Sequence, residues 1–397
     1  MKSAARNILV GLFCSLFACT IAHDASCQMT ADDLLLQVPL MSSGYVIFTT
    51  EGGSFSPVIT VSGNPSILWT WADGTTSSST APQKNYGTPA RRINKLKVTP
   101  WSALQRINIG YDGGDDGSNL IEHVPDQQVS SVRGLHLVAP YLAQWCSSYN
   151  RITSLDFCNF KNLETIECYL SQQLRSVALK NTPKLRRACF EDCNLQSLDV
   201  SGSPNLEDLR GALNNYPTIN FGNIGAHVWH ICVRDNPQLT NRSIFADLAN
   251  FPNLSELLIW NDNQTGVLRI PATHSTNRVY IAADGNQYTS LDLSGALTNI
   301  YSHAVVNLQD NQLSAVTIDG CCQINELNLM NNQLSAATLD TLLTTLDALG
   351  KSSDHIGEGE RLLVDLRGNA VPGDTGCDHA RNLVDKGWTV LAEGCPP

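Results

Sequence analysis

The stretch 324–334 reads INELNLMNNQL and decides how the rest of the chain is interpreted. Its four apolar residues and Asn332, in the ninth position, follow the template L-x-x-L-x-L-x-x-N-x-L. The pattern predicts that the L-x-L pair lies on a short strand whose apolar side chains enter a stacked core. The Asn332 amide can then bond the backbone groups left open where the chain leaves the strand. One such coil cannot bury its apolar face alone, so the pattern predicts neighbouring coils.

Aligning the template downstream of Val129 gives a ladder of predicted strands. The second apolar position of each strand falls at Trp145, Ile166, Ala188, Leu209, Ile231, Leu257, Val279, Val306, Leu327 and Val364. The early steps alternate between 21 and 22 residues, and short apolar runs between them, such as 195–200, predict a second set of strands on the back of the coils. Because a coil this short has no room for a helix, both faces are expected to be β or extended.

This periodic pattern resembles bacterial surface leucine-rich-repeat proteins of the internalin type, particularly those with a cysteine in the repeat. The resemblance covers residues 132–369 and implies a curved solenoid whose concave sheet binds a partner. Cys193 and Asp262 replace consensus asparagines, and the spacing widens to 26, 27 and 37 residues, where 241–250 and 335–350 are predicted helices. We therefore expect a mainly β leucine-rich-repeat superhelix with short repeats over residues 131–370.

Residues 371–397 are expected to form a C-terminal cap. Residues 375–386 are predicted to be a helix and 388–391 a final strand, an atypical end that covers the last apolar face of a solenoid. Cys377 and Cys395 bracket this cap and are a candidate disulfide pair.

Residues 28–130 predict an N-terminal β-sandwich. Short β-rich runs at 45–50, 57–62, 67–71, 93–98 and 106–110 are separated by turn sequences. The piece 69–75 reads WTWADGT and is similar to the W-x-D-G-T hallmark of PKD-like (immunoglobulin-like) domains. In that family the domain is a spacer or adhesion module without catalytic residues.

Residues 1–22 predict a secretory signal peptide, since Lys2 and Arg6 precede an apolar run that ends in small residues. A rival interpretation is a lipobox at 16–19 with a lipid anchor on Cys19, which would make the chain an outer-membrane lipoprotein. No later segment approaches the ~20 apolar residues of a membrane span. We expect a secreted or cell-surface protein.

The chain has 26 basic and 37 acidic residues, a net charge of −11. This surface disfavours nucleic acid as a partner and favours a soluble monomer. The most acidic loop, 111–119, holds Asp112, Asp115 and Asp116 and is a candidate calcium site, although its spacing departs from the D-x-D-x-D-G loop and a solvated turn explains it as well. No other cofactor is expected.

Thirteen cysteines raise the question of metal or thiol chemistry. Cys146, Cys189 and Cys232 fall at the same outward strand position on alternate coils, which places them ~10 Å apart, too far to share one tetrahedral ion. No metal site is predicted. The chain contains no G-x-S-x-G, no H-E-x-x-H and no phosphate-binding glycine loop, so we do not expect an enzyme.

The outward positions of the predicted concave sheet supply the candidate ligand-binding residues. They are Tyr169, Glu191, Arg210, Arg234, Trp260, Tyr280 and Gln309. Aromatic residues and arginines are enriched in binding hot spots, and this strip of mixed charge suits a protein or glycan ligand. A solvated sheet carrying stray aromatics explains the same residues.

The sequence thus predicts an exported, non-enzymatic binding or adhesion protein that recognises a protein or glycan through the concave face of its solenoid. A structural spacer of the cell envelope and an extracellular hydrolase are the alternatives. A spacer would tolerate mutation of the concave face, and a hydrolase would turn over a glycan or peptide substrate.

Overall fold

The computed structural model describes residues 44–110, 127–222, 224–239, 248–270, 278–297, 299, 301–318 and 323–395. Residues from Val46 to Pro397 form one compact unit, separate from the segment that precedes it.

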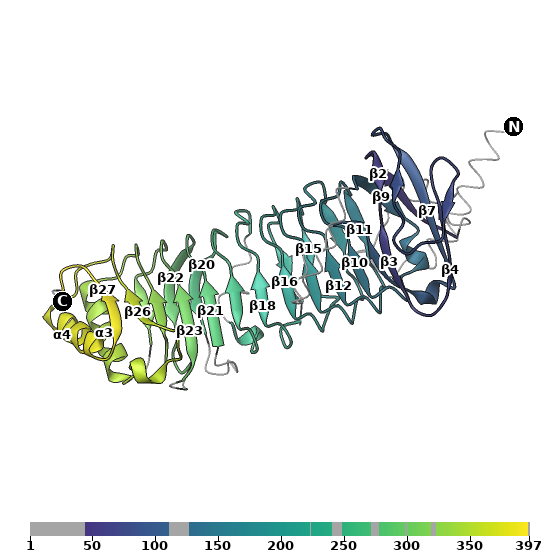
Figure 1. Ribbon diagram of the computed structural model, residues 1–397. Helices are drawn as coiled ribbons and strands as arrows, with labels where there is room; N and C mark the ends of the chain where they lie inside the picture. Colours follow the sequence, from purple (N-terminus) through teal and green to yellow (C-terminus); the bar gives the residue numbers. More distant parts are fainter. Residues whose placement is uncertain are drawn as a thin grey trace, which may run out of the picture. The chain divides into compact units, whose positions relative to one another are not determined.

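One long sheet of thirteen strands runs through the described part of the unit (Figure 1). In spatial order its strands are β3 (Val58–Val61), β8 (Leu104–Asn108), β10 (Gln144–Cys146), β12 (Thr165–Glu167), β14 (Arg187–Cys189), β16 (Asp208–Arg210), β18 (His230–Cys232), β19 (Glu256–Leu258), β21 (Arg278–Ala282), β23 (His303–Asn307), β25 (Glu326–Asn328), β26 (Leu362–Asp365) and β27 (Trp388–Leu391). Neighbours from β8 to β27 are parallel, and β3 is antiparallel to β8. The chain is a leucine-rich-repeat solenoid in which each coil adds one strand to this sheet.

The back of the coils carries shorter parallel sheets. They pair β11 (Ser154–Asp156) with β13 (Ser176–Ala178), β15 (Leu198–Asp199) with β17 (Ile219–Asn220), and β22 (Gln287–Asp292) with both β20 (Thr265–Arg269) and β24 (Ala315–Thr317). Single 3-10 turns lie at η2 (Leu135–Leu137) and η3 (Leu248–Asn250). In the early coils both faces are therefore β or extended, as their length predicts.

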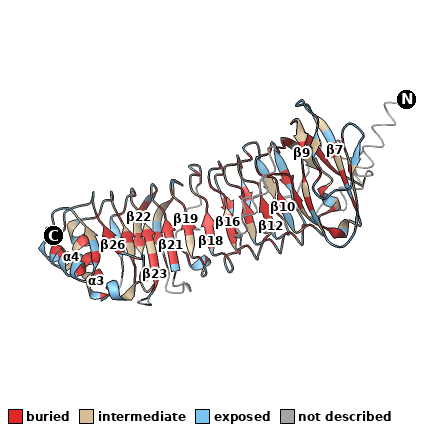
Figure 2. Cartoon of the chain, in the orientation of Figure 1, coloured by how far each residue is buried: buried red, intermediate tan, exposed pale blue. Residues whose placement is uncertain are grey.

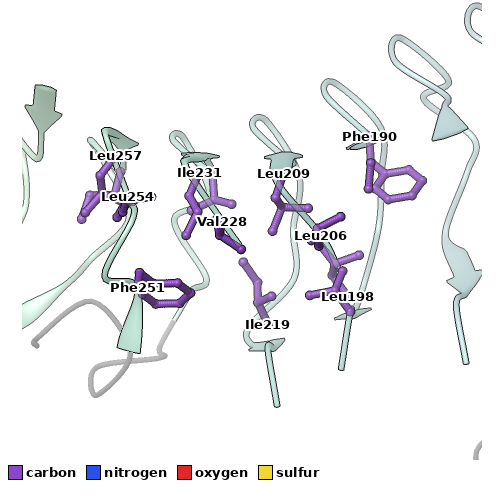
Figure 3. Close-up of a cluster of buried hydrophobic side chains, with 14 of the residues drawn as sticks. Phe190, Leu198, Leu206, Leu209, Ile219, Val228, Ile231, Phe251, Leu254 and Leu257 are labelled. Carbon is purple, nitrogen blue, oxygen red and sulfur yellow. The ribbon is translucent and has the colours of Figure 1, made fainter. Parts of the chain in front are cut away.

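Apolar side chains enter the core of each coil from both faces. Leu209, Ile231 and Leu257 come from successive strands of the long sheet, and Leu198 and Ile219 come from the back strands (Figure 3). None of the five is more than 2% exposed. Burial of a side chain of this size contributes ~1.5–3 kcal/mol, so each coil is stabilised mainly by this stack. Buried residues follow the sheet from one end of the solenoid to the other (Figure 2).

An asparagine ladder satisfies the buried backbone where the chain leaves the long sheet. The Asn332 amide nitrogen donates to the carbonyls of Leu308 (2.9 Å) and Leu329 (3.0 Å), and its side-chain oxygen accepts from the Leu313 amide (2.9 Å). The equivalent residues are Asn150, Asn214, Asn236, Asn286, Asn311 and Asn369, with Ser171, Cys193 and Asp262 in three other coils. The role predicted for Asn332 is confirmed.

The alignment predicted at β21 is wrong by two residues. Leu257 pairs with Ile281 and not with Val279, and Ile281 pairs in turn with Val306. The strand is five residues long and alternates, so Val279 and Ile281 are both buried. Tyr280, which lies between them, therefore moves to a different row of the sheet from the one predicted.

Two helices close the C-terminal end. Helix α3 (Ala336–Ala348) begins at Ser335, whose side chain accepts a hydrogen bond from the Thr338 amide. Helix α4 (Asp374–Asp385) packs against α3 and β27, and η4 (Ser353–His355) lies between them in sequence. Cys377 and Cys395 form a disulfide bond, with their Cα atoms 5.1 Å apart. Of the helix predicted at 241–250, residues 241–247 lie outside the described residues.

The front strands form an antiparallel sheet in the order β5-β4-β7-β1-β9 and a small pair, β2–β6. Their bounds are β1 (Val46–Thr50), β2 (Ser54–Phe55), β4 (Ser66–Thr70), β5 (Thr76–Ser77), β6 (Lys84–Asn85), β7 (Arg92–Thr99) and β9 (Val129–Arg133), with η1 at Trp101–Ala103. This front part shares the long sheet with the solenoid, because β8 pairs with β10 as well as with β3. The predicted limit between residues 130 and 131 falls inside β9, so a domain boundary there stays a prediction.

The W-x-D-G-T piece folds as a stabilised turn. The buried rings of Trp69 and Trp71 stack with their centroids 5.5 Å apart. Asp73 accepts hydrogen bonds from the Thr75 amide (3.0 Å) and hydroxyl (2.7 Å), and its other oxygen lies 2.6 Å from the Lys84 ammonium. The Lys84 contact, followed by the Thr75 bonds, holds the pKa of Asp73 well below its usual range. In this structure the motif therefore holds a turn together.

Candidate functional site

The outer surface of the long sheet, called the sheet face below, presents its side chains in three rows that cross the coils. Row A holds Gln144, Thr165, Arg187, Asp208, His230, Glu256, Tyr280, Val305 and Glu326. Row B holds Cys146, Glu167, Cys189, Arg210, Cys232, Leu258, Ala282, Asn307, Asn328 and Asp365. Row C holds Tyr169, Glu191, Ala212, Arg234, Trp260, Asp284, Gln309, Met330 and Arg367, which backbone hydrogen bonds keep in register.

The structure places five of the seven predicted ligand-binding residues in a single row. Tyr169, Glu191, Arg234, Trp260 and Gln309 all belong to row C. The other two lie on the same face but in other rows: Arg210 in row B, and Tyr280 in row A because of the register correction at β21. Tyr280 remains 46% exposed there.

Arg234 and Trp260 form the best-defined contact within row C. The Arg234 guanidinium carbon lies 4.9 Å from the centre of the Trp260 ring, at cation–π distance. The same guanidinium donates to Asp235 at 2.7 Å. These two contacts fix a long side chain before any partner arrives, which lowers the entropy lost on binding.

Two further residues of row C, Tyr169 and Gln309, are also held by neighbours. The Tyr169 ring meets the Tyr149 ring edge to face, with centroids 5.8 Å apart. Gln309 accepts a hydrogen bond from the Asn328 amide at 2.8 Å. Row C is therefore a pre-organised strip on the described coils.

A network of charges in rows A and B was missed by the sequence analysis. Asp208 lies 2.6 Å from His230 Nδ1, 3.2 Å from Arg210 Nε and 3.6 Å from Arg187 Nε, and His230 Nε2 lies 3.9 Å from Glu256. Burial of Asp208 works to raise its pKa, but the His230 hydrogen bond and the Arg210 charge outweigh it and hold that pKa below its usual value. Both ring nitrogens of His230 face carboxylates, so the network organises charge across the coils.

The signal for this network was present in the sequence. Arg187, Asp208, His230 and Glu256 each stand directly before a predicted second apolar position. Since the coils are in register, residues at one template position become neighbours ~4.8 Å apart. Reading that column along the chain would have found an alternation of acid and base.

The thiols of row B are unsuited to nucleophilic or metal chemistry. Cys146, Cys189 and Cys232 are buried and at most 5% exposed. Burial, with the nearby Glu191 carboxylate, raises the pKa of Cys232 to about 12, and the pKa of Cys189 is raised by the same two causes. A thiol that stays protonated at neutral pH is a poor nucleophile and a poor ligand. Within the described residues, no group of three or more His, Cys, Asp or Glu side chains could hold a metal ion.

The sheet face differs from two shallow hollows elsewhere on the unit. One hollow of about 330 Å³ is lined by Glu164, Lys184, Arg186, Asn205, Glu207 and His227. A second hollow of about the same volume is lined by Phe221, Gly222, Gly225, Ala226, Asn250, Phe251 and Pro252. Neither contains a residue of rows A, B or C.

Several predicted features lie outside the described residues. These are the signal peptide, Cys19, and the candidate calcium residues Asp112, Asp115 and Asp116. The described helices are all too short or too polar to cross a membrane.

No family model matches the chain, and no curated protein matches it. Among solved structures, a chain of the crystal structure of the LRIM1/APL1C complex is similar, with 16% sequence identity and a TM-score of 0.41. The alignment covers 64% of this chain and 51% of that chain. The assignment of the fold rests on this chain's own strand register and asparagine ladder.

Proposed function

We propose that this chain is an exported, non-enzymatic binding protein that recognises a protein partner through the sheet face. The observation that carries the proposal is the fixed Arg234–Trp260 pair in the middle of row C, with Tyr169 and Gln309 in the same row. Arginine, tryptophan and tyrosine are the residues most enriched in binding hot spots. The side chains of Arg234, Trp260 and Tyr169 are not part of the core of the solenoid.

The chemistry of the face supports a macromolecular partner over a small molecule. Small-molecule sites are concave and mostly apolar, whereas row C is a strip that crosses many coils and alternates in charge. The buried, protonated thiols and the carboxylate-paired His230 support a non-enzymatic role. The net charge of −11 disfavours nucleic acid as a partner and favours a protein with basic groups.

The location of the protein belongs to the same proposal. The leader at residues 1–22 supports export, and a lipid on Cys19 would keep the chain at the cell surface. Adhesion, a bacterial surface protein of the internalin type and a PKD-like front module are all consistent with the pattern of the sequence. A glycan ligand and a purely structural spacer are the competing functions that the experiment below separates.

The test compares two variants in which aromatic residues are replaced by alanine. The site variant replaces Tyr169, Trp260 and Tyr280. The control variant replaces two exposed tyrosines that belong to none of the three rows, namely Tyr141 and Tyr301. Mature wild-type and variant chains are applied to a surface-protein array and to a glycan array, after thermal melting has shown that all are folded.

We expect wild type and the control variant to capture the same protein and the site variant to bind at least tenfold more weakly. Capture of a glycan alone would favour the glycan alternative. Equal capture by all three chains would contradict a site on the sheet face, and capture by none would favour the spacer.

A further inference from the structure

One backbone position repeats along the rim of the sheet face. In ten of the described coils the residue directly before the asparagine-ladder position has a left-handed backbone, with φ between +49° and +73°. We call this row the rim: Tyr149, Leu170, Asp192, Leu213, Asp235, Asn261, Gly285, Asp310, Asn331 and Gly368. Each rim residue follows a row C position or its equivalent.

Seven coils fill the rim with residues suited to that conformation. Glycine has no Cβ to clash, and asparagine and aspartate tolerate a left-handed backbone better than other side chains do. Asn261 and Asn331 also donate to the neighbouring rim aspartates, at 2.9 Å and 2.8 Å. The sequence of these coils therefore agrees with their backbone.

The other three coils have bulky residues at the rim in place of glycine, asparagine or aspartate. Tyr149, Leu170 and Leu213 have φ values of 60°, 56° and 57°, in the region that costs a large side chain most. Burial does not explain them, since Tyr149 is 44% and Leu213 43% exposed and Leu170 is half-buried. Leu297, which also has a positive φ of 55°, is only 6% exposed and is explained by packing in the core.

A strained backbone carrying an exposed apolar side chain is unfavourable for the isolated fold. Such outliers concentrate at functional positions, where binding makes use of the residue that folding alone would reject. The three residues lie together, because they belong to the first, second and fourth of the coils that form the rim. Tyr149 also contacts Tyr169, a predicted binding residue of row C.

Acidic groups interrupt this apolar rim. Asp192 occupies the rim of the coil between Leu170 and Leu213, and Glu191 precedes it in row C. Neighbouring coils are ~4.8 Å apart, so along the rim Asp192 lies two steps, or ~10 Å, from Tyr149, and Leu213 lies three steps, or ~14 Å, from it. Same-side residues of an extended chain are ~6.7 Å apart. Three same-side residues of a bound extended chain would therefore face three groups in turn. The first would face Tyr149 and Leu170, the second the carboxylates of Glu191 and Asp192, and the third Leu213.

We propose that the rim segment formed by Tyr149, Leu170, Asp192 and Leu213, together with Glu191, binds an extended protein segment of the pattern apolar–x–basic–x–apolar. This inference rests on the proposed function, in which the sheet face binds a protein, and it names the chemistry of the segment that is bound. The negative charge of the chain complements the basic residue, and the exposed rim side chains contact the two apolar ones.

The experiment exploits the opposite effects that a binding role predicts for stability and affinity. Tyr149→Asn, Leu170→Asn and Leu213→Asn, singly and combined, install the residue that the other coils use. Asp310→Asn is the matched control, because it makes a change to asparagine at the same position of a distant coil. Melting temperatures are measured by circular dichroism. Binding is measured with fluorescein-labelled peptides of the pattern Leu-x-Arg-x-Leu, beside Leu-x-Glu-x-Leu and Ser-x-Arg-x-Ser peptides.

We expect each rim substitution to raise Tm by about 2 °C and the triple variant to bind the Leu-x-Arg-x-Leu peptides at least tenfold more weakly. Wild type should prefer these peptides to both control sets, and Asp192→Asn with Glu191→Gln should remove only the preference for arginine over glutamate. A lower Tm in the rim variants would show that these side chains serve the fold and would overturn the inference. Failure of wild type to bind or to discriminate the peptides would overturn it as well.

The same variants separate this inference from the proposed function. If the site variant of the sheet face loses capture on the protein array while the rim variant keeps it, only the rim inference fails. If neither variant loses capture, the proposed function fails too.

Discussion

Replacing Asp262 by asparagine should stabilise the solenoid, and the gain should grow with pH. Asp262 occupies the asparagine-ladder position of its coil and is completely buried. Its Oδ1 accepts from the Asn236 amide at 2.7 Å, as a ladder asparagine would, but its Oδ2 has no hydrogen-bond partner. An amide nitrogen at that place would donate to the backbone carbonyls that the other ladder asparagines use. The wild-type carboxyl group therefore accepts the hydrogen bond of the ladder but does not donate the hydrogen bonds that an asparagine donates.

The magnitude follows from the pKa. Burial, opposed in part by the Asn236 hydrogen bond, raises the pKa of Asp262 from 3.8 to about 9. The unfolded chain then releases this proton at lower pH than the folded chain does, so stability falls as pH rises from about 4 to about 9. At ~1.36 kcal/mol per pH unit the upper limit at pH 7 is about 4 kcal/mol. Hydration of the ionised carboxylate in the folded chain lowers its pKa and so reduces this cost. We therefore expect Asp262→Asn to raise the free energy of unfolding at pH 7 by about 2–4 kcal/mol.

The assay is urea unfolding at pH 5, 7 and 9 with wild type, Asp262→Asn and the control Asp310→Asn. Asp310 lies on the exposed rim and accepts from Asn331, a role that an asparagine oxygen can keep. The difference between Asp262→Asn and wild type should increase across the series, whereas the control should follow wild type. A destabilised Asp262→Asn chain, or a difference that does not change with pH, would refute the reasoning.

Three further predictions concern other parts of the fold. Asn332→Ala removes three donated hydrogen bonds and one accepted one in a buried site and should cost about 3 kcal/mol in urea unfolding, while the exposed Asn215→Ala should cost less than ~0.5. The double replacement of Cys377 and Cys395 by serine opens a link across 18 residues and should cost about 3 kcal/mol, seen as earlier proteolysis of the C-terminal cap. Cys232 should resist iodoacetamide at pH 8 in the folded chain and react fully in urea, and labelling of the native protein within minutes would contradict its burial.

The repeats could be predicted from sequence because their signal is local. The template places an apolar pair and an asparagine at fixed offsets, and the strands around Ile166, Leu209 and Leu327 lie where it puts them. At β21 the same rule failed, since Val279 and Ile281 are both apolar and both enter the core. A period of two cannot tell which of them pairs with Leu257. Only contact with the preceding coil decides it.

The joint between the front strands and the solenoid depends on long-range pairing. The apolar residues of β8, Leu104 and Ile107, are buried as their character predicts, but nothing in the strand says that it pairs with β10, 38 residues further on. The candidate site also has one part that the sequence predicts and one part that only the structure reveals. Row C was found because its positions follow from the template, whereas the strain at Leu213 is visible only in the backbone.

The parallel pairing of the coils determines how the solenoid carries a pulling force. Hydrogen bonds between neighbouring strands point along the direction in which the coils stack, so tension between the first and last coils loads every strand pair in series. The weakest pair yields first, and each coil of 21 or 22 residues that opens releases about 70 Å of extended chain. A solenoid held at both ends would therefore lengthen in discrete steps and absorb mechanical work while the rest of its coils stay folded.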